Sequence, residues 1–237
     1  MKNFIQSFGR CFLDFLYPRI CVACRTQISE TETDICFECQ WALPRNTNLL
    51  IHNDSPENKF WGRVKTDGIY SFLTFTKGGK VQNILHALKY HNLPHLAVFL
   101  GTLCGKAVQD QQLFKEADCL VPVPLHPSRL KERGYNQAER IAAGVAEILQ
   151  IPVYTELLVR NKSTKTQTRT GGRLSRYQNL EGVFELTPQS EVLYQKRVIL
   201  VDDVLTTGAT LEVAASALWE AAPKELYILT LAAVRRN

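Results

Sequence analysis

The chain has 237 residues, of which 45% are hydrophobic and 22% are charged. This is ordinary globular composition, so it excludes a disordered or fibrous protein, and the length suits one full domain with a small appendage. The formal charge of +5, from 28 Lys and Arg against 23 Asp and Glu, permits an anionic partner without requiring one. The longest apolar stretch, residues 96–104, is far below the roughly 20 residues of a membrane-spanning helix.

The first residues carry an amphipathic pattern. Large apolar side chains recur at intervals of three and four residues, at Phe4, Ile5, Phe8, Phe12, Phe15 and Leu16. This spacing predicts one apolar helix face, and Pro18 ends the helix. We expect the helix to dock on the protein's own core; attachment to a membrane surface or to a partner is the alternative. Arg10 and Asp14 interrupt the apolar run and no small-residue cleavage site follows, so we expect no export signal and a cytoplasmic protein.

Four of the seven cysteines lie close together in the chain. They form two C-x2-C pairs separated by eleven residues, Cys21 with Cys24 and Cys36 with Cys39. Each pair can aim two sulfurs at one ion from a tight turn, and two pairs complete a tetrahedron, which predicts a structural zinc site. Four thiolates leave no position for water, so the site would supply folding energy and no chemistry. A redox pair is the competing interpretation.

From Gly68 onward the pattern alternates between strands and helices. Strands are predicted over residues 69–75, 119–125, 197–201 and 226–234, and helices over residues 81–90, 96–109, 137–149 and 211–221. This alternation predicts an α/β fold, in which helices cover both faces of a parallel sheet and ligands bind at the carboxyl ends of its strands. Residues 44–62 are polar and turn-forming. We therefore expect residues 1–60 to hold the N-terminal helix, the zinc module and a connection, and residues 61–237 to form the main domain.

Residues 198–210 are the most informative segment. A buried strand leads to two adjacent carboxylates, Asp202 and Asp203, and a loop rich in Thr and Gly precedes a helix. Gly208 allows a close turn, so that backbone N–H groups and a helix N-terminus can face one phosphate. The phosphate site would consist of Thr206, Thr207, Gly208, Ala209 and Thr210. Carboxylates just upstream can hold a diol, directly or through Mg²⁺, which predicts a ribose 5-phosphate ligand. An ordinary strand-to-helix turn is the alternative.

Positive charge is concentrated in two segments. Residues 157–180 contain six basic and no acidic residues, and Gly171 and Gly172 indicate a mobile loop there. The second segment, residues 129–133, carries three basic residues just after the predicted 119–125 strand. Such charge can hold a diphosphate, contact a nucleic-acid backbone, or form a solvated surface, and these three uses stay open.

Residues 198–210 resemble the PRPP-binding segment of type I phosphoribosyltransferases, where PRPP is 5-phosphoribosyl 1-diphosphate. With the four cysteines, the chain resembles the ComF family of competence proteins in particular. Three further segments carry that resemblance: residues 88–90, residues 121–137, and Thr166–Gln167 followed by Arg176, Asn179 and Phe184. Two departures are visible. His91 and Asn92 stand where family members often have a Gly, and the spacing from Gln167 to Arg176 is about one residue long.

The resemblance implies a type I phosphoribosyltransferase core that binds PRPP with Mg²⁺ and acts in natural competence and DNA uptake. It implies that the ribose lies near Asp202 and Asp203. It implies diphosphate contacts, some of them on a flexible lid, from Lys89, Arg129, Arg133, Lys165, Gln167 and Arg176. Single-stranded DNA and other competence proteins, such as a DNA-uptake helicase, are the implied partners.

Whether the chain transfers a phosphoribosyl group stays open. Relatives that salvage purines often carry a carboxylate at the position of Thr206, and threonine cannot act as that base. The resemblance favours a pentosyl transferase with an unidentified acceptor. The alternative is a non-catalytic module that senses PRPP or binds single-stranded DNA through the same basic segment.

Overall fold

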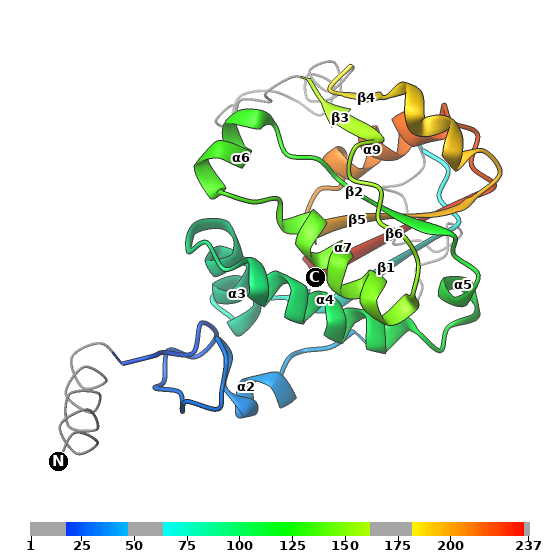
Figure 1. Cartoon of the computed structure of the whole chain (residues 1–237). Coiled ribbons are helices and arrows are strands. Elements are labelled where there is room, and N and C mark those ends of the chain that lie inside the picture. The colour runs from blue at the N-terminus through cyan, green and yellow to red at the C-terminus, as the bar shows by residue number, and fades with distance from the viewer. Residues whose placement is uncertain (1–17, 47–63, 162–181, 235–237) are drawn as a thin grey trace, which may run out of the picture.

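A computed structural model describes residues 18–46, 64–161 and 182–234 (Figure 1). The amphipathic segment predicted at residues 4–16 lies outside these ranges. The described elements are α2 (Phe37–Trp41), β1 (Gly68–Phe75), α3 (Lys80–Tyr90), α4 (Pro94–Val108), α5 (Gln112–Lys115), β2 (Cys119–Pro122), α6 (Pro127–Arg133), α7 (Gln137–Leu149), β3 (Leu158–Arg160), β4 (Phe184–Leu186), the 3-10 helix η2 (Pro188–Leu193), β5 (Arg197–Leu205), α9 (Ala209–Trp219) and β6 (Glu225–Val234).

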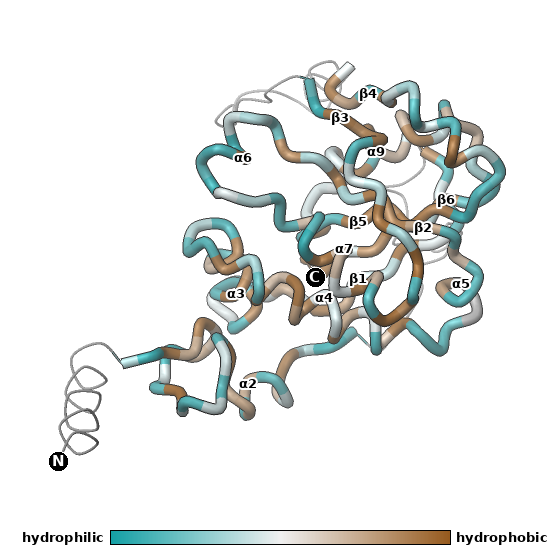
Figure 2. Tube along the Cα trace, in the orientation of Figure 1, coloured by the Kyte–Doolittle hydropathy of each residue, from teal (hydrophilic) through white to brown (hydrophobic). Residues whose placement is uncertain are grey.

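Within the described residues, four strands form a sheet in the order β1-β6-β5-β2, and each neighbouring pair is parallel. Alternate side chains of a strand point to opposite faces, and both faces are buried here. Ile199 and Val201 of β5 pack toward α3, α4 and α7, whereas Val198 and Leu200 pack toward α9. The apolar colour of these strands in Figure 2 follows from that double burial. The predicted parallel sheet with helices on both faces is confirmed.

Several predictions differ from the structure, and one of them is the strand predicted over residues 119–125, which ends at Pro122 as β2. β5 was predicted to end at Val201, but its ladder with β6 continues to Leu205. The predicted basic loop at residues 157–180 begins with strand β3, which pairs antiparallel with β4. Residues 44–46, predicted as part of a polar connection, form hydrogen bonds to β1: Thr74 N donates to Pro44 O, and Asn46 N to Phe72 O, each over 2.8 Å. The division at residue 60 stays a prediction.

The four-cysteine module packs against α3 and α4. Its buried apolar residues belong to the same cluster as those of α3, α4 and β1. Asn83 Nδ2 of α3 donates to Ala23 O over 2.8 Å, and His95 Nε2 of α4 lies 2.6 Å from Asp34 Oδ2. The module therefore contacts the helix that carries Lys89.

Among the described residues, none of the helices combines the length and the apolarity that crossing a membrane requires.

Helices α4 and α7 touch through glycine. A Cβ added to Gly144 of α7 would collide with the Val98 carbonyl oxygen and stand 2.6 Å from Thr102 N, both on α4. A Cβ on Gly101 of α4 would collide with the Ile141 carbonyl oxygen. The absence of side chains at these two positions sets how closely the helices approach.

We predict that Gly144→Ala destabilises the protein by about 1–3 kcal/mol, because the methyl group overpacks a backbone contact. In an exposed helix the same change would stabilise by about 1 kcal/mol. The measurement is the urea midpoint of unfolding, with Arg140→Ala, at an exposed position of α7, as the control. A midpoint equal to or above that of the native chain would contradict the packing described here.

Candidate functional site

The Sγ atoms of Cys21, Cys24, Cys36 and Cys39 all lie within 4.8 Å of one another. Cys24 Sγ and Cys36 Sγ are 3.8 Å apart, which matches the edge of about 3.8 Å expected of a tetrahedron with Zn–S bonds of about 2.3 Å. Backbone N–H groups already point at two of the sulfurs: Cys36 N donates to Cys21 Sγ over 3.3 Å, and Cys39 N to Cys36 Sγ over 3.4 Å. The cluster can hold one metal ion, and its all-sulfur donor set suits zinc.

The thiols of the cluster differ in acidity. A side-chain hydrogen bond with Thr26 lowers the pKa of Cys24 to about 6, whereas burial raises the pKa of Cys36 and of Cys39. Only thiolates bind zinc, so the ion would have to displace protons from the buried members.

The carboxylate pair lies in β5, near the carboxyl end of the sheet. Asp203 is buried, and Lys89 Nζ lies 2.9 Å from its Oδ2. Asp202 Oδ1 accepts the Asp203 backbone N–H over 2.8 Å. Desolvation, followed by repulsion from Asp203, raises the pKa of Asp202 to about 8. Lys89 thus forms an ion pair with Asp203, whereas the carboxyl group of Asp202 is mostly protonated at neutral pH.

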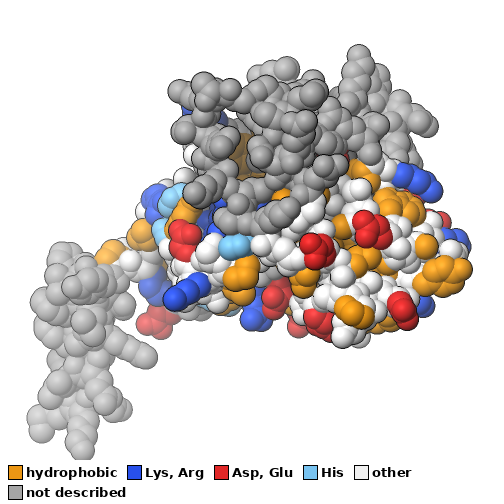
Figure 3. Space-filling model, turned by 90° about the horizontal axis from the view of Figure 1, so that it is seen from above, with side chains coloured by type: hydrophobic (Ala, Val, Ile, Leu, Met, Phe, Trp, Pro, Cys, Tyr) orange, Lys and Arg blue, Asp and Glu red, His pale blue; other side chains and the backbone are white. Residues whose placement is uncertain are grey.

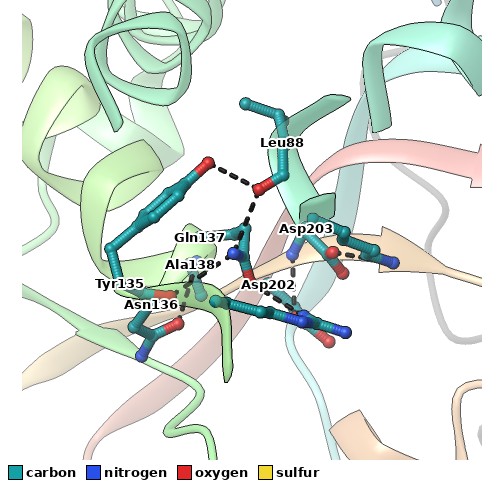
Figure 4. A network of polar contacts seen from close by, with 9 residues as sticks. Leu88, Tyr135, Asn136, Gln137, Ala138, Asp202 and Asp203 are labelled. Carbon is teal, nitrogen blue, oxygen red and sulfur yellow. Dashed lines mark hydrogen bonds and ion pairs between the residues drawn. The ribbon is translucent and has the colours of Figure 1, made fainter. Parts of the chain in front are cut away.

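The Leu88 carbonyl oxygen, one residue before Lys89, accepts two hydrogen bonds, one from the turn between α6 and α7 and one from the first residue of α7. Tyr135 Oη donates over 2.6 Å and Gln137 Nε2 over 3.1 Å (Figure 4). Burial raises the pKa of Tyr135 to about 12, so its hydroxyl remains a donor at neutral pH. Arg133 Nη1 donates to Gln137 Oε1 over 2.8 Å and orients the amide. Leu88 is among the last four carbonyls of α3, which have no partner within the helix, so these bonds fix the end that carries Lys89.

Arg160 lies near the carboxylate of Asp202, and Arg129 lies near Arg160. Burial and the nearby Arg129 lower the pKa of Arg160, while Asp202 opposes that shift. Arg160 comes from β3, where its guanidinium lies 5.3 Å from the centre of the Phe184 ring, and Arg129 comes from α6. The acidic pair thus has cations beside it from α3 and β3, and Arg129 of α6 is a neighbour of the β3 cation.

The loop after β5 has the predicted shape. Thr206 and Thr207 are exposed, and Gly208 is the N-cap of α9 with φ of 80°. A φ in this region favours glycine, because other residues are strained there. Ala209 and Thr210 form the first turn of α9, whose N-terminal N–H groups are available to an anion.

The structure brings together part of the predicted site. It places Lys89, Arg129, Asp202, Asp203 and the 206–210 loop at one edge of the sheet, whereas Arg133 is engaged with Gln137. Lys165, Gln167 and Arg176 lie outside the described residues. The sequence indicated no individual role for Tyr135 or Gln137, although both lie in residues 121–137, which carry the family resemblance. It indicated Arg160 only as one of the basic residues at 157–180.

Comparison with known proteins gives relatives along most of the chain. Residues 136–237 match the phosphoribosyl transferase domain family. Competence protein F of Haemophilus influenzae is 32% identical over 227 residues, covering 90% of this chain and 96% of that protein. Competence protein ComFC of Bacillus subtilis is 37% identical over 210 residues, 85% and 78% of the two chains. DNA utilization protein YhgH of Escherichia coli K12 is 27% identical over 213 residues, 81% and 87% of the two chains.

We predict that the purified protein carries about one zinc ion per chain. Cys36→Ser should lower the zinc content and the thermal midpoint together, because the metal supplies folding energy to a short module. Elemental analysis and a thermal melt are the measurements. Cys104→Ala, at a buried cysteine outside the cluster, is the control and should leave the zinc content unchanged. Equal zinc in both variants would show that the four cysteines do not hold it.

The pKa of Asp202 predicts a pH dependence of stability. The pKa of this carboxyl is about 8 in the folded state, against an ordinary value of 3.8. Between these two values the folded state binds more protons than the unfolded state does. The free energy of unfolding therefore falls as the pH rises from about 4 to about 8. Asp202→Asn removes the titrating group. The free energy of unfolding of this variant should therefore increase relative to that of the native chain as the pH rises. Urea unfolding at several pH values measures it, with Asp110→Asn, at an exposed position, as the control. A gain that does not change with pH would contradict the prediction.

Proposed function

This chain belongs to the ComF family of competence proteins, and from that membership we propose that it is a PRPP-binding, phosphoribosyltransferase-like protein that serves DNA uptake. The matched phosphoribosyl transferase domain supports the ligand class. The names of the relatives, competence protein F and DNA utilization protein, support the process.

One observation carries the proposal: an acidic pair lies in a parallel strand, and a short loop after that strand ends in a glycine that caps the next helix. Gly208, at φ of 80°, is the N-cap of α9, so the first N–H groups of that helix follow it directly, and the exposed Thr206 and Thr207 precede it. We assign the 5-phosphate to this loop. The ribose hydroxyls then lie toward Asp202 and Asp203, which sit just upstream in β5.

The diphosphate would lie on the cationic side of the same edge. Lys89, Arg129 and Arg160 supply charge there from three elements. Carboxylate oxygens are ligands that Mg²⁺ prefers, so Asp202 and Asp203 would be the residues that hold the ion, and its binding would displace the proton of Asp202. When bound, Mg²⁺ would neutralise charge on the departing group. Arg133 donates to Gln137 and so supports the turn that positions Lys89. Its direct contact with diphosphate stays a prediction.

The chemistry that this arrangement supports is a substitution at the ribose anomeric carbon. The bond from C1 to the diphosphate oxygen breaks, charge develops on the ribose ring and on the diphosphate, and a nucleophile bonds to C1. Cations fixed by α3, α6 and β3 would stabilise the departing diphosphate in place. Thr206 offers no base, so the acceptor either needs no deprotonation by this loop or loses its proton to a base elsewhere.

The test of PRPP binding is calorimetric titration with Mg²⁺ and PRPP. Gly208→Val should abolish binding while the chain stays folded, because the new side chain fills the phosphate loop and is strained at this φ. Thr207→Val, which removes only a hydroxyl, should weaken binding about 5- to 10-fold. Thr155→Val, at an exposed threonine outside the loop, is the matched control. Unchanged affinity in Gly208→Val would remove the phosphate-loop assignment.

Transfer is tested by incubating the protein with Mg²⁺, PRPP and a panel of bases, amines and single-stranded DNA, and by following diphosphate release. An enzyme should release diphosphate only with its acceptor, and Asp203→Asn should lose that signal. Tight PRPP binding without acceptor-dependent release would instead favour a PRPP-sensing module.

A further inference from the structure

Two large aromatic side chains are exposed on α2, the short helix of the four-cysteine module. Phe37 is 54% exposed and Trp41 is 85% exposed. They stand four residues apart on one face of the helix, whereas the buried Cys39 lies on the other side. Among the described residues, no other large hydrophobic side chain is as exposed as Trp41. The two rings form an apolar patch, and such patches mark surfaces that another segment or molecule covers.

The start of the described chain is held beside this α2 patch. Arg19 Nη2 donates to the Glu32 carbonyl oxygen over 2.8 Å, and Glu32 Oε1 accepts the Phe37 backbone N–H over 2.8 Å. Glu32 thus links the start of the described chain to the start of α2. The amphipathic segment predicted at residues 4–16 ends three positions before Arg19. Figure 3 shows hydrophobic side chains at its left, the side on which Figure 1 places the start of the described chain.

We propose that residues 4–16 fold back over the module as an amphipathic helix and cover the α2 patch of the same chain. Six large apolar residues of this segment share one predicted face, and four of them are phenylalanines. A helix of thirteen residues is about 20 Å long, which exceeds the single helical turn between the two rings. Because only two residues separate the segment from Arg19, its local concentration at the patch is high.

The charge of the module favours this occupant over a membrane. Residues 29–41 contain four acidic and no basic residues, namely Glu30, Glu32, Asp34 and Glu38. An anionic lipid surface would be repelled by them. Helices that lie on such membranes are rich in Lys and Arg on the polar face, whereas residues 1–17 carry only Lys2 and Arg10, against Asp14. The excess charge of residues 1–17 is opposite to that of the module, so the two attract each other.

The cover would act on the helix that carries part of the metal cluster. Cys36 is the N-cap of α2, and Cys39 lies within it. A segment packed on the outer side of α2 therefore holds two of the four sulfurs in place from outside the cluster. The patch and the segment include none of the residues proposed to bind PRPP. This inference therefore does not rest on the proposed function.

The experiment is acrylamide quenching of Trp41 fluorescence in the full-length chain, with Trp61 and Trp219 replaced by Phe so that Trp41 is the only emitter. An uncovered ring that is 85% exposed would be quenched nearly as strongly as free N-acetyltryptophanamide. A ring covered by residues 4–16 should instead be protected and should emit at shorter wavelength. The urea midpoint of each variant shows whether it is folded.

Phe8→Ser combined with Phe12→Ser should remove this protection, so that the quenching constant rises several-fold. Leu13→Ser changes an apolar residue outside the predicted face and is the matched control, so it should keep the protection. A second measurement uses the native tryptophans. Because one contact is lost only once, the paired Phe variants should lower the urea midpoint of the native chain but not that of Trp41→Ser.

Four results would overturn the cover: strong quenching of Trp41 in the unaltered segment, protection that persists in the folded Phe8 and Phe12 variant, an equal loss of protection in Leu13→Ser, or additive midpoint losses. Protection that disappears on dilution, together with a dimer in sedimentation, would assign the patch to a second copy. Binding of the native protein to vesicles of phosphatidylcholine and phosphatidylglycerol, lost in the Phe variant, would assign the segment to a membrane. Either result would also overturn the proposal.

Discussion

Carboxylates on consecutive residues repel each other, and the repulsion grows where burial removes the screening of water. The fold reduces this repulsion in two ways. Lys89 forms an ion pair with Asp203, and the pKa of Asp202 is raised to about 8, so that its carboxyl is mostly protonated at neutral pH. The lysine comes from α3, so everything that holds α3 in place also maintains the charge balance of the pair. The turn between α6 and α7 holds the carboxyl end of α3 through Tyr135, and the four-cysteine module contacts the same helix at Asn83. These contacts keep the acidic pair at the sheet edge, directly upstream of the loop proposed to bind phosphate.

Much of the fold was predictable, because its elements are long and periodic. Helix α7 occupies residues 137–149, as its apolar spacing and the capping Asn136 indicate. β5 was predicted too short, because two acidic residues look like the end of a buried strand, whereas their backbones continue the ladder with β6. The short strand β3 was missed, because its pairing with β4 depends on a contact across the chain that no local pattern records. Helix α6 was also missed, since it is seven residues long, polar, and has no buried face.

The candidate site was predictable where it is local and unpredictable where it is assembled. Four cysteines at metal spacing and a glycine after paired aspartates are each contained in one segment, and the structure brings the members of each segment together. The ion pair from Lys89 to Asp203 joins α3 to β5, and the approach of Arg160 to Asp202 joins β3 to β5. Such contacts arise from the parallel topology, which places the carboxyl ends of distant strands side by side. The domain match and the relatives support the proposed ligand class and the proposed process, which no contact in the structure identifies.

The hydrogen bonds from residues 44–46 to β1 have a consequence for solubility. β1 is the outer strand of the sheet, and a bare outer strand offers a row of unpaired backbone groups to any other chain. Pro44, Arg45 and Asn46 cover part of that row, since Arg45 pairs with Leu73 in the antiparallel sense. A chain that began at residue 61 would lose this cover together with the module, and its sheet would be open to edge-to-edge aggregation. Residues 44–46 thus protect this edge of the sheet from pairing with another chain.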